Sequence, residues 1–89
     1  MLPLDYIGVK DVNGDDIFIG SVIEHCGNLY VIKFSKNRKE VVARKEPLKG
    51  QTMSWRNLNW INRCSPYIKI IGTILSNDIV LKNKFKDVF

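Results

Sequence analysis

The chain of 89 residues has few of the side chains from which catalytic and metal sites are built. Histidine occurs once, as His25, and the two cysteines are Cys26 and Cys64. A Ser/His or Cys/His catalytic arrangement would have to use His25, and a zinc site needs about four ligands. Cys26 follows His25 directly, and neighbours in a strand point to opposite faces. We therefore expect no enzyme, no metal and no cofactor, and the roles of these three residues stay open.

Other sequence signals are missing as well. The six glycines stand singly, so no glycine-rich loop is available to hold a phosphate group. No apolar run is long enough to span a membrane, and residues 1–5 lack the charged and apolar regions of a signal peptide. Two cysteines are too few for a disulfide scaffold. The expected location is a reducing cytoplasm, with no membrane partner.

The stretch 8–23 places a polar turn between two extended apolar pieces. Asn13-Gly14 is a strong turn signal because both residues tolerate positive φ. The spacing of Asp11, Asn13 and Asp15 resembles the start of a calcium loop, which also needs glycine at its sixth position and glutamate at its twelfth. Aspartate and valine stand at those positions. The interpretation is a solvated turn without calcium.

Alternating apolar residues and turn signals predict one mostly β domain over residues 1–89. The expected strands cover 22–25, 29–34, 40–44 and 67–75, with hairpin loops at 26–28 and 35–39. Tyr30, Ile32 and Phe34 share one face of their strand, and we place that face in the core. Gly72, inside the last strand, predicts a bulge or a close backbone contact.

Three segments are less regular. Residues 1–7 predict an extended arm or an edge strand, and 45–54, which contains a proline and a glycine, predicts a mobile surface loop. The segment 55–63 fits both a short helical turn and an irregular strand, so both interpretations stay open.

At the C-terminal end, apolar residues recur at helical spacing and predict a short helix over 77–89. Phe85 and Phe89 fall on its apolar side. They either close the open end of a barrel or contact a second subunit. The strand predicted over 67–75 is apolar on both faces, which also keeps a homo-oligomer open.

The basic residues are concentrated in the middle of the sequence. Between Lys33 and Lys49 there are seven basic residues against two acidic ones, an excess equal to the whole net charge of +5. The candidate binding residues are the cations and tryptophans of this region and the next: Arg44, Lys45, Lys49, Trp55, Arg56, Trp60 and Arg63. Such a cluster can bind single-stranded nucleic acid, a nucleotide or an acidic protein patch. It can equally be two core tryptophans with a solvated cationic rim.

Two pieces of the chain carry a family resemblance. Residues 8–23 contain Gly-Val-Lys-Asp, Asn-Gly, Ile-Phe and a Gly-Ser step, and residues 68–78 read IKIIGTILSND. In order, separation and total length they resemble the YopX-like family of small phage and prophage proteins. Ser21, Thr73 and the start of the last predicted helix depart from the residues usual in that family. The resemblance implies an SH3-like β-barrel of about five strands with a short C-terminal helix, and no catalytic residues.

Three functional hypotheses follow. The first is a phage-encoded, non-enzymatic binding module in the host bacterial cytoplasm, which engages a host protein and antagonises a defence or regulatory system. The second is binding of nucleic acid or a nucleotide messenger through the basic and aromatic segment 44–63. The third is a self-assembling structural protein.

Overall fold

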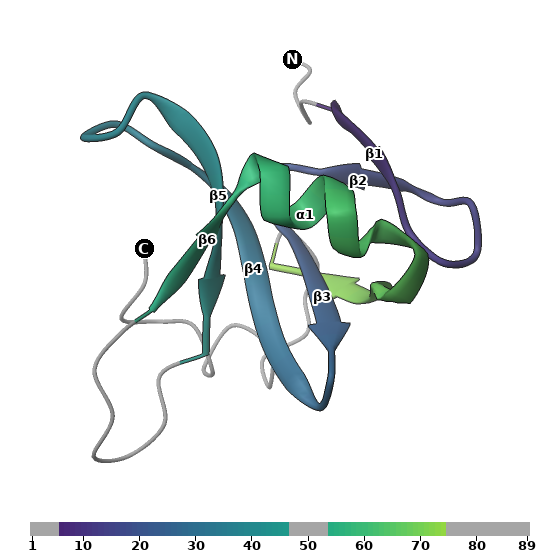
Figure 1. Cartoon of the computed structure of the whole chain (residues 1–89). Coiled ribbons are helices and arrows are strands. Elements are labelled where there is room, and N and C mark those ends of the chain that lie inside the picture. Colours follow the sequence, from purple (N-terminus) through teal and green to yellow (C-terminus); the bar gives the residue numbers. More distant parts are fainter. Residues whose placement is uncertain (1–5, 47–53, 75–89) are drawn as a thin grey trace.

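A computed structural model of the chain describes residues 6–46 and 54–74, and strands make up most of this part (Figure 1). The elements are β1 (Tyr6–Lys10), β2 (Asp16–Phe18), β3 (Ser21–His25), β4 (Asn28–Ser35), β5 (Glu40–Lys45), β6 (Trp55–Asn57), α1 (Leu58–Cys64), a single 3₁₀ turn η1 (Ser65–Tyr67) and β7 (Lys69–Thr73). The prediction of a mostly β protein is confirmed. The helix expected over 77–89 and most of the expected loop 45–54 lie outside the described residues.

The larger sheet joins segments that are far apart in the sequence. Its strand order is β6-β5-β4-β3-β7, and β3 pairs antiparallel with β7. Ile23 lies opposite Ile70, and Val22 lies opposite Gly72, so Ile71 is an extra residue on β7. This is the bulge predicted at Gly72. The pairing places the two segments that carry the family resemblance side by side.

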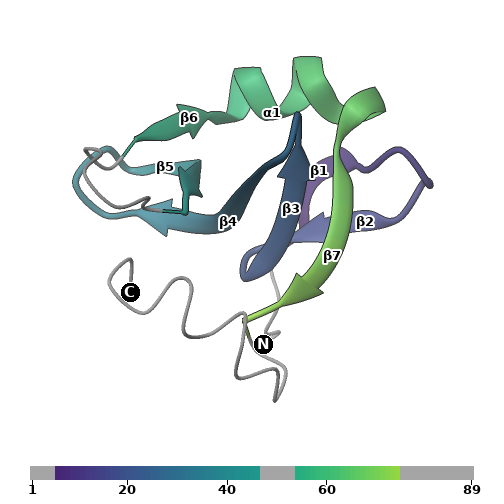
Figure 2. The ribbon, with the colours of Figure 1, turned by 90° about the horizontal axis from the view of Figure 1, so that it is seen from below.

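The described strands form two separate sheets. β1 and β2 make a two-stranded antiparallel ribbon at the right of Figure 1. The N–H of Val12, in the turn of this ribbon, donates to the carbonyl oxygen of Ile68 at 2.8 Å and connects the ribbon to the residue just before β7. α1 lies along one face of the five-stranded sheet (Figure 2). No ladder among the described strands closes these sheets into one barrel. The described strands number seven, whereas about five were expected.

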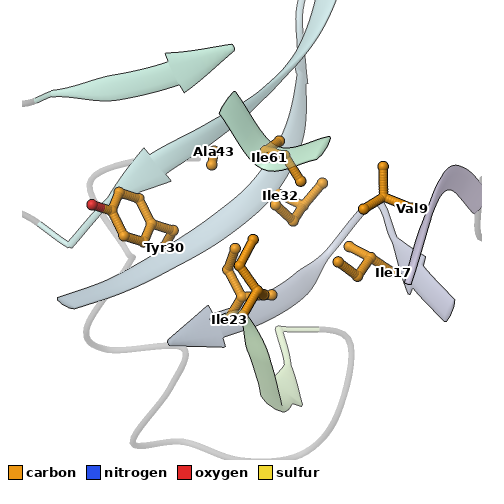
Figure 3. Packing of buried hydrophobic residues seen from close by; sticks show 8 residues of the cluster. Val9, Ile17, Ile23, Tyr30, Ile32, Ala43 and Ile61 are labelled. Atoms are coloured by element: carbon orange, nitrogen blue, oxygen red, sulfur yellow. The ribbon is translucent and has the colours of Figure 1, made fainter. Parts of the chain in front are cut away.

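The main core lies between the five-stranded sheet, the β1–β2 ribbon and α1 (Figure 3). Its buried members are Val9, Ile17, Ile23, Tyr30, Ile32, Ala43, Ile61 and Ile68. Tyr30 and Ile32 were predicted here, but Phe34, predicted on the same face, is 50% exposed. Phe34 lies near the end of β4, next to the β4–β5 hairpin loop, so the core does not reach it. β4 also buries its other face, where Val31 packs against Val22 in a second cluster.

Each of the two tight turns has a glycine in the left-handed region. Gly14 has φ +82°, and Asn13 before it does not have a positive φ. β3 and β4 are joined by Cys26 and Gly27 alone, at φ 52° and 79°. Positive φ at both central residues is characteristic of the two-residue turns that match the twist of a hairpin. Asn28, predicted in this loop, is the first residue of β4.

The segment 55–63 contains both structures that its sequence allowed. Three residues form β6, and the chain then turns directly into α1. Asn57 makes the change possible, because its extended backbone ends the strand while its Oδ1 accepts the N–H of Trp60 at 2.9 Å. The strand predicted over 67–75 is shorter than expected. Tyr67 belongs to η1 and is 75% exposed, and regular pairing begins at Lys69.

Asn57→Ala is expected to lower the free energy of unfolding by about 1 kcal/mol, the usual cost of losing a helix N-cap. Chemical denaturation of the variant and the parent protein measures this directly. Asn59→Ala, on the exposed side of the same helix, is the control and should change the free energy of unfolding by less than about 0.5 kcal/mol. Equal effects of both substitutions would mean that the cap contributes nothing.

Asp11 is buried, although its turn was predicted to be solvated. Its Oδ1 accepts the N–H groups of Asn13 and Asp15 at 2.9 and 2.8 Å. Its Oδ2 accepts the N–H of Ile70 at 3.1 Å, across 59 residues of sequence. Burial by itself raises the pKa of Asp11, but the three N–H donors outweigh it and hold the pKa below its usual value. The carboxylate therefore orders the turn and connects it to β7.

Candidate binding surface

Trp55, the first residue of β6, is the centre of one group of cations. It lies directly opposite Arg44 of β5. Arg38, in the β4–β5 hairpin loop, places its guanidinium carbon 3.9 Å from the centroid of the Trp55 ring. The Arg38 Nε is also 3.5 Å from Oε2 of Glu40. A guanidinium that lies over an indole ring makes a cation–π contact, and its donors suit bidentate contact with a carboxylate or phosphate. We call Arg38, Arg44 and Trp55 the outer group.

Trp60, in α1, is the centre of a second group on the other face of the sheet. Its ring centroid lies 5.1 Å from that of Tyr30 and 5.1 Å from that of His25, the latter edge-on. The guanidinium carbon of Arg56 lies 5.8 Å from the centroid of the Trp60 ring. Trp60 packs against the main core and is partly buried, while Arg56 is exposed. We call Arg56, Trp60 and His25 the inner group.

The predicted cluster is therefore divided between two faces. Trp55 and Arg56 are consecutive residues of a strand, so their side chains point to opposite sides of the sheet. Lys45 lies opposite Tyr30 on the inner side, and Arg63 is in the last turn of α1. Lys49, like Phe85 and Phe89, lies outside the described residues. Both tryptophans are partly buried, so neither is wholly a core residue nor wholly a surface residue.

Lys33 adds a further positive charge to the outer face. It is a diagonal neighbour of Arg44, because Val31 pairs with Arg44 and Lys33 with Val42. Burial lowers the pKa of Lys33 below its usual value, and the nearby charge of Arg44 lowers it further. Lys33 and Arg44 therefore place two like charges close together on the outer face.

Two members of these groups, Arg38 and His25, and the neighbouring Lys33 were missing from the predicted site. Arg38 and Lys33 lie within the basic segment, but no spacing rule indicates that a hairpin loop reaches Trp55. The sequence indicated His25 only as a candidate catalytic or metal-binding residue. The separation of Trp55 from Arg56 could have been found, because alternation follows as soon as residues 55–57 are assigned to a strand.

His25 and Cys26 make an unexpected contact. Sγ of Cys26 lies 3.8 Å from Nε2 of His25, although we expected the two side chains to point apart. Cys26 belongs to the turn rather than to the strand, so strand alternation does not apply to it. Within residues 6–46 and 54–74, no three His, Cys, Asp or Glu side chains lie close enough together to hold a metal ion.

No helix in the described part of the chain has the length and apolar character that crossing a bilayer requires. No family model matches the sequence, and no curated protein matches it. The resemblance to the YopX-like family therefore depends only on the two segments quoted above, and the candidate function depends on the geometry of the outer and inner groups.

Proposed function

We propose that this protein is a non-enzymatic binding module of phage or prophage origin that engages an acidic surface of a host bacterial protein in the cytoplasm. The proposed family is the YopX-like family, with a partly open form of the SH3-like barrel. The pairing of β3 with β7 supports this assignment, because it joins the two segments that resemble the family. Antagonism of a host defence or regulatory system is the proposed consequence of binding.

The observation that carries the proposal is the guanidinium of Arg38 stacked on Trp55 beside Arg44. The contacts with Trp55 and Glu40 restrict the positions of the Arg38 guanidinium before a partner arrives, which reduces the entropy lost on binding. Arginine and tryptophan are enriched at protein interfaces, where both are frequent binding hot spots. A carboxylate of the partner would meet donors that are already oriented.

Nucleic-acid or nucleotide binding is the second candidate. Single-stranded binding uses aromatic rings as stacking platforms within a cationic groove. In this protein the Arg38 guanidinium occupies one face of Trp55, and Tyr30 and His25 contact Trp60. Bases would have to displace these groups or use the remaining ring surface. The geometry therefore favours an acidic protein over a nucleic acid.

Affinity capture from a lysate of the host bacterium tests the proposed function. The tagged full chain is expected to recover one host protein in stoichiometric amount, as measured by mass spectrometry. Arg38→Gln should reduce this recovery several-fold. Lys69→Gln removes the same charge from β7, at the opposite edge of the sheet, and should leave it unchanged.

Gel shifts with a single-stranded oligonucleotide at two salt concentrations test the second candidate. Binding driven by phosphate contacts weakens steeply as salt rises. A salt-sensitive shift that depends on Arg38, together with no captured protein, would replace the proposed function by nucleic-acid binding.

A further inference from the structure

β6 is the outermost strand of the five-stranded sheet among the described residues. Which of its backbone groups face outward follows from its pairing with β5. The N–H of Lys45 donates to the carbonyl oxygen of Ser54 at 3.0 Å. Hydrogen-bonded and non-hydrogen-bonded pairs alternate along an antiparallel ladder, so Ala43 and Arg56 form the next hydrogen-bonded pair. The backbone N–H groups of Trp55 and Asn57 then point away from β5, toward the edge at which no described strand pairs with β6.

The outer and inner groups meet at this edge. Trp55 presents the outer group on one face of β6, and the next residue, Arg56, presents the inner group on the other face. A strand added beside β6 would alternate its side chains in the same way. Successive residues of one extended segment would therefore contact the two groups in turn. The division of the predicted cluster between two faces therefore matches the alternating side chains of a strand added at this edge.

We propose that the edge of β6 accepts an extended acidic segment of the partner protein as an added strand. Carboxylates on adjacent residues of that segment would contact Arg38 and Arg44 on the outer face and Arg56 on the inner face. The backbone of the segment would accept hydrogen bonds from the N–H groups of Trp55 and Asn57. This inference rests on the proposed function and specifies how the acidic partner is recognised, a mode known generally as β-strand addition.

Charge complementarity selects this occupant over a second copy of the chain. Two copies joined edge to edge through β6 would bring the arginines of both groups close to their own counterparts. Like charges across a strand pair are unfavourable, and charged side chains on edge strands commonly prevent such self-pairing. An acidic strand converts the same arginines into attractive contacts.

Amide NMR of the full-length ¹⁵N-labelled protein with a synthetic peptide tests the inference. The probe is acetyl-Val-Glu-Glu-Val-Glu-Glu-Val-amide, which carries adjacent carboxylates in a strand-forming sequence. Its addition is expected to shift the Trp55 and Asn57 amides and slow their hydrogen exchange, while amides of β7 stay unchanged. The same peptide with N-methylated central residues keeps its charge but cannot form the ladder, and should bind about tenfold more weakly. A version of the peptide with glutamine in place of glutamate should lose most of its affinity. The acidic peptide should likewise lose most of its affinity for Arg56→Gln.

Each contrary result is informative. Equal binding of the methylated peptide would overturn strand addition while leaving acidic recognition intact. Equal binding of the glutamine peptide would overturn the role of charge. Protection of Trp55 that rises with protein concentration in the absence of peptide would assign the edge to a second copy and overturn the inference. No response to the acidic peptide would also overturn it, and Arg38-dependent capture of a host protein would then show that the proposed function stands without it.

Discussion

Replacing Asp11 with alanine is expected to lower the free energy of unfolding by about 3 kcal/mol, a large effect for a domain of this size. The substitution leaves three backbone N–H groups without the carboxylate that accepts them, including that of Ile70 in β7. It also removes a connection between the β1–β2 ribbon and the larger sheet. Urea denaturation followed by tryptophan fluorescence measures the change. Asp15→Ala, in the same turn and exposed, is the control and should cost less than about 1 kcal/mol.

The contribution of Asp11 depends on pH in a predictable direction. Its pKa in the folded protein is lower than its usual value of 3.8, so the unfolded chain takes up the proton first as the pH falls. The stabilisation is complete above the unfolded pKa and is lost as the pH falls through the folded pKa. Unfolding midpoints of the parent and Asp11→Asn should therefore differ at pH 7 and converge at strongly acidic pH. A difference that stays constant down to that pH would contradict the assignment of the carboxylate.

Reversing one charge in the outer group and one in the inner group is expected to weaken binding of the acidic partner about 100-fold. Arg38→Glu with Arg56→Glu turns two attractive contacts into repulsive ones, and like charges across an interface are strongly unfavourable. Lys36→Glu with Lys69→Glu gives the same net charge at exposed positions outside both groups. Isothermal titration calorimetry with the captured host protein measures both affinities. If the two double variants weaken binding equally, net charge drives association and the arginine–tryptophan geometry is irrelevant.

Local sequence signals predicted β3, β4, β5 and β7 and the tight turns, but not β1 and β2 as strands. Gly14 and Gly27 supply positive φ values in their turns, and Gly72 marks the bulge opposite β3. These features depend on a few neighbouring residues, so a single sequence is enough to find them. The pairing of β3 with β7 joins residues far apart in the sequence, and local signals alone do not specify it.

Features that depend on contacts distant in sequence were missed. Asp11 has the composition of a solvated turn, and only its position against Ile70 shows that it is buried. Phe34 continues the apolar alternation of β4, but the core ends before it does. The stacking of Arg38 on Trp55 joins a hairpin loop to an edge strand across a curved sheet. The alternation of polar and apolar residues does not indicate where that loop lies relative to β6.

The central claim is that the partner binds at the edge of β6, where the two arginine–tryptophan groups meet. Hydrogen exchange of the full-length protein, alone and in complex with the captured host protein, tests it most directly. The account predicts slower exchange of the Trp55 and Asn57 amides in the complex and unchanged exchange along β7. Protection confined to β7 or to the β1–β2 ribbon, with β6 unaffected, would contradict it.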